Sequence, residues 1–108
     1  IGEYIARRHF EDEGFVVVQK NYTVRGGEID LIVQKGTLLV FVEVKWRQNT
    51  TFGTAADALT RQKLMRMRHT LSRYLTEHPH RGPVRMDALF IDGKHPALRI
   101  THMSGIGT

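Results

Sequence analysis

Apolar residues recur along the chain at two different spacings, which together predict two helices and four or five strands. A first helix is expected from Gly2 to Glu13, where the residues suit a helix and the following Gly14 can end it. A longer second helix is expected from about Ala55 or Thr60 to about Glu77. The stripe of this helix that should face the core consists of Leu64, Met67, Leu71, Tyr74 and Leu75.

Three runs between these helices are rich in β-branched and aromatic residues and read as strands. The first, Phe15–Val18, is almost wholly apolar and is expected inside the sheet. The other two, Glu28–Gln34 and Thr37–Trp46, flank Lys35 and Gly36, which suit a tight turn. They therefore predict a β-hairpin.

Two further strands are expected after the second helix, at Arg85–Asp92 and at Ala97–Met103, with the latter at the edge of the sheet. A hairpin is antiparallel, whereas a strand–helix–strand crossover is usually parallel and right-handed. The order of elements therefore predicts a mixed sheet in the α/β or α+β class. With 108 residues, the chain is expected to form a single domain, residues 1–108.

The predicted hairpin gathers charged residues on one face. Side chains alternate along a strand, so Glu28 and Asp30 share a face of their strand, and Glu43 and Lys45 share a face of the next. With Lys35 and Gly36 as the turn, Asp30 lies diagonally from Glu43 and Glu28 lies directly across from it. Several carboxylates and an ammonium group should then lie close together.

Carboxylates held so close repel one another, and their partial burial is costly, so a divalent cation would relieve the repulsion. Carboxylate oxygens and water suit Mg²⁺, which contacts substrate phosphate while keeping several waters. Asp30 and Glu43 are therefore the expected Mg²⁺ ligands, with Mn²⁺ as a substitute ion. Lys45 could orient or deprotonate an attacking water, or neutralise charge that develops in the transition state.

The composition favours a polyanionic partner. Sixteen Lys and Arg residues against eleven Asp and Glu residues give a formal net charge of +5. Basic residues also gather on the second helix, where Arg66 lies on the face opposite the core and is expected to contact phosphates and not bases.

The same composition excludes other classes of protein. A hydrophobic fraction of 41% with 25% charged residues is that of a folded globular chain. No run reaches the roughly 20 apolar residues needed to span a bilayer, and the start has no secretory-signal pattern, so a cytoplasmic protein without a membrane partner is expected. Because the chain opens on Ile1 and not on Met, we expect a short piece to precede it. The absence of cysteine rules out thiolate chemistry and leaves oxygen and imidazole as metal ligands.

The segments Gly27–Ile32 and Phe41–Lys45 resemble the D-x(n)-E-x-K signature of PD-(D/E)XK nucleases. More narrowly, the chain resembles the YraN-type family of predicted bacterial endonucleases, which is similar to archaeal Holliday-junction resolvases. The resemblance covers most of the chain. It implies a restriction-endonuclease-like α-β-β-β-α-β core with a mixed central sheet flanked by helices, dependence on Mg²⁺ and a DNA substrate.

By this resemblance, Asp30, Glu43 and Lys45 take the signature roles, the main-chain carbonyl of Val44 is a further metal ligand, and Glu3 of the first helix completes the catalytic site. The residues expected to bind nucleic acid are Arg25, Arg47, Lys63 and Arg66. A homodimer is also expected, because resolvases act on two-fold junctions.

The leading functional prediction is a Mg²⁺-dependent deoxyribonuclease, a phosphodiester hydrolase with branched DNA among its substrates. The alternatives are a nucleic-acid-binding module without turnover and a subunit of a larger DNA-processing assembly. Simpler explanations of single residues also stay open. Asp30, Glu43 and Lys45 could form a surface ion network, and three pairs could be structural: Glu28 with Arg25, Glu3 with Arg7, and Asp87 with Arg85.

Overall fold

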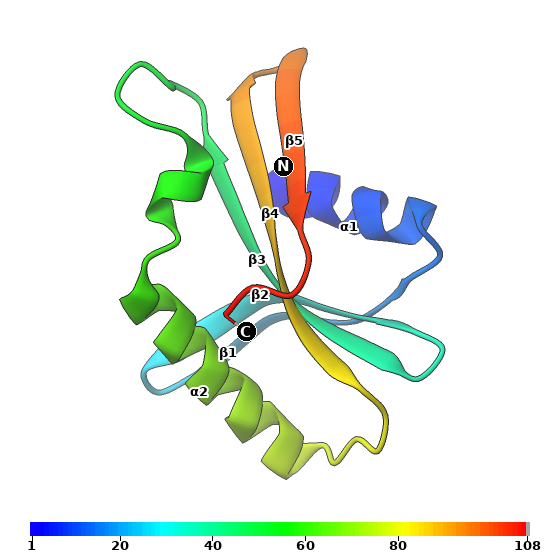
Figure 1. Cartoon of the computed structure of the whole chain (residues 1–108). Coiled ribbons are helices and arrows are strands. Elements are labelled where there is room, and N and C mark those ends of the chain that lie inside the picture. Colours follow the sequence, from blue (N-terminus) through cyan, green and yellow to red (C-terminus); the bar gives the residue numbers. More distant parts are fainter. Residues whose placement is uncertain (108) are drawn as a thin grey trace.

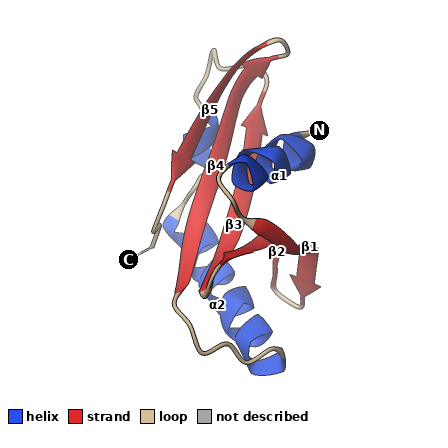
Figure 2. Ribbon diagram, turned by 90° about the vertical axis from the view of Figure 1, so that its right-hand side faces the viewer, coloured by secondary structure: helices blue, strands red, loops and turns tan. Residues whose placement is uncertain are grey.

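A five-stranded sheet in the order β1-β2-β3-β4-β5 forms the centre of the structure, a computed structural model that describes residues 1–107. The two α-helices lie on opposite sides of the sheet (Figure 1, Figure 2). The elements, in chain order, are α1 (Gly2–Asp12), β1 (Val16–Val24), β2 (Gly27–Lys35), β3 (Leu38–Arg47), the short 3₁₀ helix η1 (Ala55–Ala58), α2 (Arg61–Glu77), β4 (Val84–Lys94) and β5 (Ala97–Met103).

The connections give the sheet its mixed character. The pairs β1/β2, β2/β3 and β4/β5 are antiparallel, and β3 pairs with β4 in parallel across the η1–α2 crossover. The first six of these elements, with η1 left aside, follow the α-β-β-β-α-β order of a restriction-endonuclease-like core, and β5 extends the sheet. The predicted fold class is therefore confirmed.

Each face of the sheet has its own hydrophobic core, because neighbouring residues of a strand point to opposite faces. Val40 packs on the α1 side and the adjacent Phe41 on the α2 side. The α1 side joins Ala6 and Phe10 to Leu31, Val33, Val42 and Leu89. The α2 side joins Met67 and Tyr74 to Ile32, Ala88 and Phe90, and the predicted stripe of α2 packs into it.

Both helices begin and end close to the predicted residues. A helix turn closes at Glu13, and Gly14 then adopts a positive φ of 94°, which lets the chain turn into β1. Thr60 caps α2, since its Oγ1 accepts a hydrogen bond from the Lys63 backbone N–H at 3.1 Å. No helix in residues 1–107 is both long enough and apolar enough to cross a bilayer.

The structure corrects the predicted position of the first strand. We expected Phe15–Val18 inside the sheet, but β1 is an edge strand that pairs only with β2, and Val16 and Val18 are 63% and 41% exposed. A short apolar run does not reveal how many neighbours its strand has. The strand also continues through the polar residues Gln19, Lys20 and Asn21 to Val24, and polar or charged residues are common on edge strands.

The register of the β2–β3 hairpin also differs from the prediction. Gln34 pairs with Leu39 and Lys35 with Leu38, so the two turn residues are Gly36 and Thr37. Gly36 has a φ of 59° and takes the first central position of the turn, whereas we had assigned it to the second. The register is shifted by two residues, an even number, so the predicted faces are preserved along the paired residues 31–35 and 38–42. The alternation of β2 breaks next to Asp30, because Ile29 joins Ile32 in the core on the α2 side.

Candidate active site

Asp30 lies where β2 and β3 separate. The ladder between these strands ends at the pair Leu31 and Val42, and β3 then continues away from β2 (Figure 1). The Asp30 side chain enters the opening, where its Oδ2 accepts a hydrogen bond from the Val44 backbone N–H at 2.8 Å. In a strand, the N–H and C=O of one residue project from the same edge. The Val44 carbonyl therefore also faces the opening.

Glu43 brings a second carboxylate to the same opening from β3. Its side chain is 8% exposed, and its Oε2 lies 2.9 Å from Nζ of Lys63, in the first turn of α2. The hydrogen bond with Glu43 is the main cause that raises the pKa of Lys63, and it outweighs the opposing effect of burial. Lys63 is therefore a firmly charged partner of this carboxylate.

The two carboxylates face each other. The pKa of Asp30 is raised to about 6, mainly by burial and then by the charge of Glu43 and a hydrogen bond between the two side chains. The Val44 N–H and the charge of Lys63 act in the opposite direction but do not cancel the rise. Asp30 and Glu43 thus meet at one partly buried point, where burial and the charge of Glu43 both disfavour the ionised form of Asp30.

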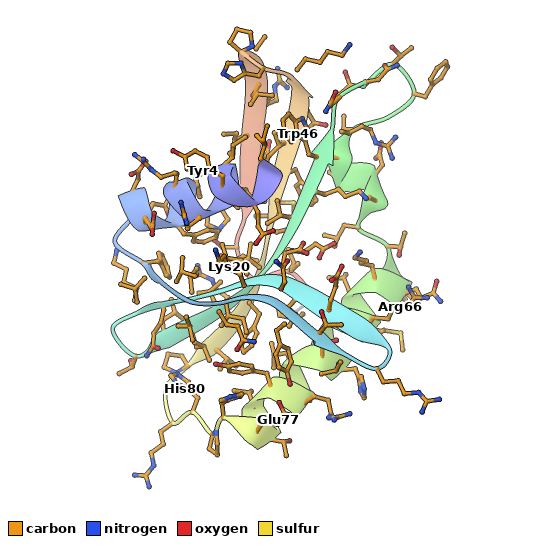
Figure 3. The ribbon with its side chains drawn as sticks, turned by 180° about the vertical axis from the view of Figure 1, so that it is seen from behind. Tyr4, Lys20, Trp46, Arg66, Glu77 and His80 are labelled. Atoms are coloured by element: carbon orange, nitrogen blue, oxygen red, sulfur yellow. The ribbon has the colours of Figure 1, made fainter. Side chains whose placement is uncertain are left out.

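A cavity of about 390 Å³ opens beside Glu43 on the α2 side, and its polar wall includes Glu28, Lys63 and Arg66. Figure 3 shows Arg66 on α2 close to the turn between β1 and β2. A side chain at Gly27 in place of hydrogen would collide with Oγ1 of Thr70 on α2. Glycine at this position therefore lets α2 approach β2 closely enough to form the cavity wall.

Glu3 approaches Asp30 from the α1 side of the sheet. A smaller cavity of about 230 Å³ is lined by Glu3, Asp30 and Val44. Nδ2 of Asn21 donates a hydrogen bond to Oε1 of Glu3 at 3.1 Å. The alternative pairing of Glu3 with Arg7 was wrong, because Arg7 pairs with Glu11 at 3.9 Å.

The other predicted site residues lie at different distances from the two acids. Lys45 is half-buried on β3, two residues beyond Glu43, and takes part in none of the ion pairs of residues 1–107. Arg25 is exposed at the β1–β2 turn, next to the cavity. Arg47 lies nearer the loop before η1, where its Nη1 would be 3.3 Å from a Cβ at Gly53.

Of two expectations about acidic residues, the one for Glu28 is wrong and the one for Asp87 is confirmed. Glu28 pairs with Thr23 of β1 and does not lie directly across from Glu43, because the hairpin register is shifted. Its charge nevertheless contributes to the raised pKa of Lys63, after the larger effects of Glu43 and Asp30. Asp87, in contrast, forms the expected pair with Arg85, through two hydrogen bonds of 2.8 Å.

The pairing of Lys63 with Glu43 was not predicted from the sequence, where Lys63 was expected only to contact nucleic acid. The available signal was Thr60, which as a helix cap fixes Lys63 in the first turn of α2. The tilt of α2 across β2 and β3 brings that turn onto Glu43, and no pattern in the sequence encodes this tilt.

The order of elements and the mixed sheet place the chain in the restriction-endonuclease-like fold class, with two acids at the point where β2 and β3 separate. The chain belongs to the uncharacterised protein family UPF0102, whose family model matches residues 2–91. This confirms the YraN-type resemblance at the level of the family.

Relatives of the same family align over nearly the whole chain. A UPF0102 protein of Beutenbergia cavernae is 42% identical over 108 residues, which cover 98% of this chain and 92% of the relative. A UPF0102 protein of Frankia casuarinae is 41% identical, with 96% and 90% covered. One from Neisseria meningitidis is 35% identical, with 96% and 91% covered. The chain therefore represents nearly the full length of these relatives.

Proposed function

We propose that this protein is a metal-dependent endonuclease that hydrolyses DNA phosphodiester bonds, with branched DNA as the first substrate to test. The observation that carries the proposal is the meeting of Asp30 and Glu43, from two neighbouring strands, at one partly buried point. Two partly buried carboxylates that lie this close destabilise the fold by their mutual repulsion unless a cation binds between them.

The donor atoms at this point suit a magnesium ion. Asp30, Glu43 and the Val44 carbonyl would hold it through oxygen alone, which is the chemistry that Mg²⁺ and Mn²⁺ prefer. The raised pKa of Asp30 supports this assignment, because it reflects a carboxylate that is first buried and then placed next to the charge of Glu43, and a bound cation would offset both effects. When bound, Mg²⁺ lowers the pKa of water and stabilises negative charge on a phosphate undergoing attack.

The side chains around the two acids would position the substrate. Lys45, on the face of β3 that carries Glu43, would orient the attacking water or take up its proton, or else neutralise charge on the phosphate. Glu3 would complete the site from the α1 side. In-line attack of water on phosphorus would leave a 5′-phosphate and a 3′-hydroxyl.

The basic residues near the cavity would bind the DNA backbone. Arg66 lines the cavity and Arg25 is exposed at its rim, so both can reach phosphates of a strand that passes over Glu43. Lys63 would exchange its contact with Glu43 for a phosphate once a metal ion neutralises the carboxylate. Arg47 would contact a more distant phosphate. Such contacts fix the position of the backbone and carry no sequence information.

Cleavage assays test this proposal directly. Linear, flapped, single-stranded and four-way DNA substrates are incubated with Mg²⁺ or Mn²⁺ and with the wild-type protein, Asp30→Asn or Glu43→Gln. The proposal expects metal-dependent cleavage by the wild-type protein and its loss in both variants. Glu11→Gln, an equal change of charge on the exposed side of α1, is the matched control and should cleave normally. Unchanged cleavage by both site variants would refute the assigned site.

A nucleic-acid-binding module without turnover is the second candidate. The specific observation in its favour is the Lys63–Glu43 ion pair, which neutralises one of the two acids from within the protein. Such a module would bind DNA with an affinity that falls steeply as salt rises, and it would cleave no substrate in either metal. A role as a subunit of a larger DNA-processing assembly stays a prediction, as does the homodimer, which light scattering would test.

A further inference from the structure

A cluster of three side chains on the α1 side of the sheet resembles a transition-metal site. His9 and Glu13 lie one helical turn apart at the end of α1, and His102 lies on β5. Nε2 of His9 is 3.0 Å from Nδ1 of His102 and 3.5 Å from Oε2 of Glu13. The three ligand atoms all lie within 4.8 Å of one another, and no other three His, Asp or Glu side chains in residues 1–107 come together in this way.

Hydrogen bonds hold His102 in the tautomer that a metal requires. Its Nε2 lies 2.7 Å from Oδ2 of Asp87, which is fully buried and also accepts hydrogen bonds from Arg85. Asp87 also accepts a hydrogen bond from the Gly105 backbone N–H at 3.1 Å, so it is surrounded by donors. The Asp87 carboxylate pairs with the Arg85 guanidinium and acts as an acceptor, so Nε2 of a neutral His102 donates to it and Nδ1 presents a lone pair toward His9.

The hydrogen bond between His102 and Asp87 matches those that histidine ligands of zinc usually make. A histidine ligand usually donates its second ring N–H to a carboxylate, which fixes the ring and increases its basicity. Asp87 supplies that carboxylate to His102, and Arg85 holds it in place. Ligand atoms around tetrahedral zinc are about 3.3 Å apart, given Zn–N distances of 2.0–2.1 Å. The observed separations of 3.0 Å and 3.5 Å are close to this value, and the Glu13 side chain must rotate to bring its separation from His102, at most 4.8 Å, to the same value.

We propose that His9, Glu13 and His102 form a Zn²⁺-binding site that joins the end of α1 to β5. In the metal-free protein, Nε2 of His9 carries a proton and donates it to Nδ1 of His102 in a hydrogen bond. On binding, Zn²⁺ would take the place of this proton, and His9 would carry its proton on Nδ1 instead. Three protein ligands leave the fourth position to water. Imidazole nitrogen selects Zn²⁺ over Mg²⁺, so this site differs in chemistry from the all-oxygen point at Asp30 and Glu43. It also lies near Phe10, on the α1 side of the sheet, whereas Glu43 faces α2.

Calorimetric titration of the metal-free protein with ZnCl₂ tests the proposal. Wild-type protein should bind one Zn²⁺ per chain, and His9→Gln and His102→Gln should each weaken that binding at least tenfold. His69→Gln, which changes an exposed histidine of α2, is the matched control and should bind as the wild type does. Glu43→Gln should also keep the affinity, which separates this ion from one held at the candidate active site.

A second measurement works on the wild-type protein and does not depend on how the variants fold. Ring nitrogen resonances of all six histidines can be followed by NMR as ZnCl₂ is added. Selective shifts of His9 and His102 at one equivalent support the site. The proposal is overturned if zinc fails to bind, if it binds the two histidine variants as well as the wild type, or if it shifts only other histidines.

Discussion

Nζ of Lys63 lies 2.9 Å from Oε2 of Glu43, so a cation from the protein already touches one of the two acids that we assign to a metal ion. The lysine lies in the first turn of α2 and the glutamate in the middle of the sheet. Metal binding must therefore displace or tolerate this ammonium group, and the competition between them can be measured.

Lys63→Met should bind Mg²⁺ about three- to tenfold more tightly than the wild type, because a competing positive charge is lost next to a ligand. Cleavage should nevertheless weaken, since the same residue would hold a phosphate. Calorimetry gives the affinity, and a DNA titration gives the apparent KM. Lys94→Met, which changes an exposed lysine at the end of β4, is the control. Equal or weaker Mg²⁺ binding by Lys63→Met would show that no such competition exists.

Asp30→Asn should stabilise the metal-free protein at neutral pH. The pKa of Asp30 is about 6 in the fold against an ordinary value of 3.8, so the folded protein holds this proton more tightly than the unfolded chain. Stability is therefore lost as pH rises from 3.8 to about 6, and the loss is complete above that range. Asparagine can still accept the Val44 N–H, and the expected gain at pH 7 is about 1 to 2 kcal/mol, after allowance for partial exposure.

Urea unfolding in the presence of a chelator measures this effect at two pH values. At pH 7 the variant should be more stable than the wild type, and near pH 4 the difference should be small. Asp12→Asn, which removes an exposed carboxylate at the end of α1, should show no such gain. A variant that is less stable at pH 7 would mean that the Asp30 charge is well compensated without metal.

Tyr22→Phe should destabilise the fold by about 1 to 2 kcal/mol. The Tyr22 hydroxyl donates a 2.6 Å hydrogen bond to Oε1 of Glu77 and so ties β1 to the end of α2. This hydrogen bond and burial raise the pKa of Tyr22, so its contribution is complete below pH 10 and is lost as pH rises through the higher value in the fold.

Thermal unfolding at neutral and alkaline pH gives the measurement. The variant should melt at a lower temperature than the wild type at pH 7, and the difference should shrink at strongly alkaline pH. Tyr4→Phe is the matched control, because Tyr4 is 54% exposed and its ring contacts Arg7. Equal losses in the two variants would point to a general effect of removing a phenol.

Much of the fold could be predicted because local signals and tertiary packing agree. Gly14 ends α1 and Thr60 caps α2, and each acts within a few residues of its own position. The apolar stripe of α2 likewise needs only the helical repeat. Phe15–Val18 was misplaced because strand order depends on partners far along the chain, which a short apolar run does not specify.

The candidate site was predictable in part for a related reason. Asp30 and Glu43 stayed together despite the wrong register, because each lies directly beyond the last pair of the β2–β3 ladder, Leu31 and Val42. The Lys63 contact depends on the angle at which α2 crosses the sheet. The His9–His102 contact depends on β5 lying next to β4. Both contacts join segments that are far apart in the sequence, and neither produces a periodic pattern of residues from which it could be predicted.

The central claim is that Asp30 and Glu43 jointly hold one divalent ion. The backbone amide of Val44 reports on this ion most directly, because its N–H donates a hydrogen bond to Oδ2 of Asp30. Mg²⁺ titration followed by ¹H–¹⁵N NMR should move the Val44 resonance saturably in the wild-type protein and leave it in place in Glu43→Gln. A Val44 resonance that does not respond to millimolar Mg²⁺ in the wild type, or that moves equally in the variant, would contradict the claim.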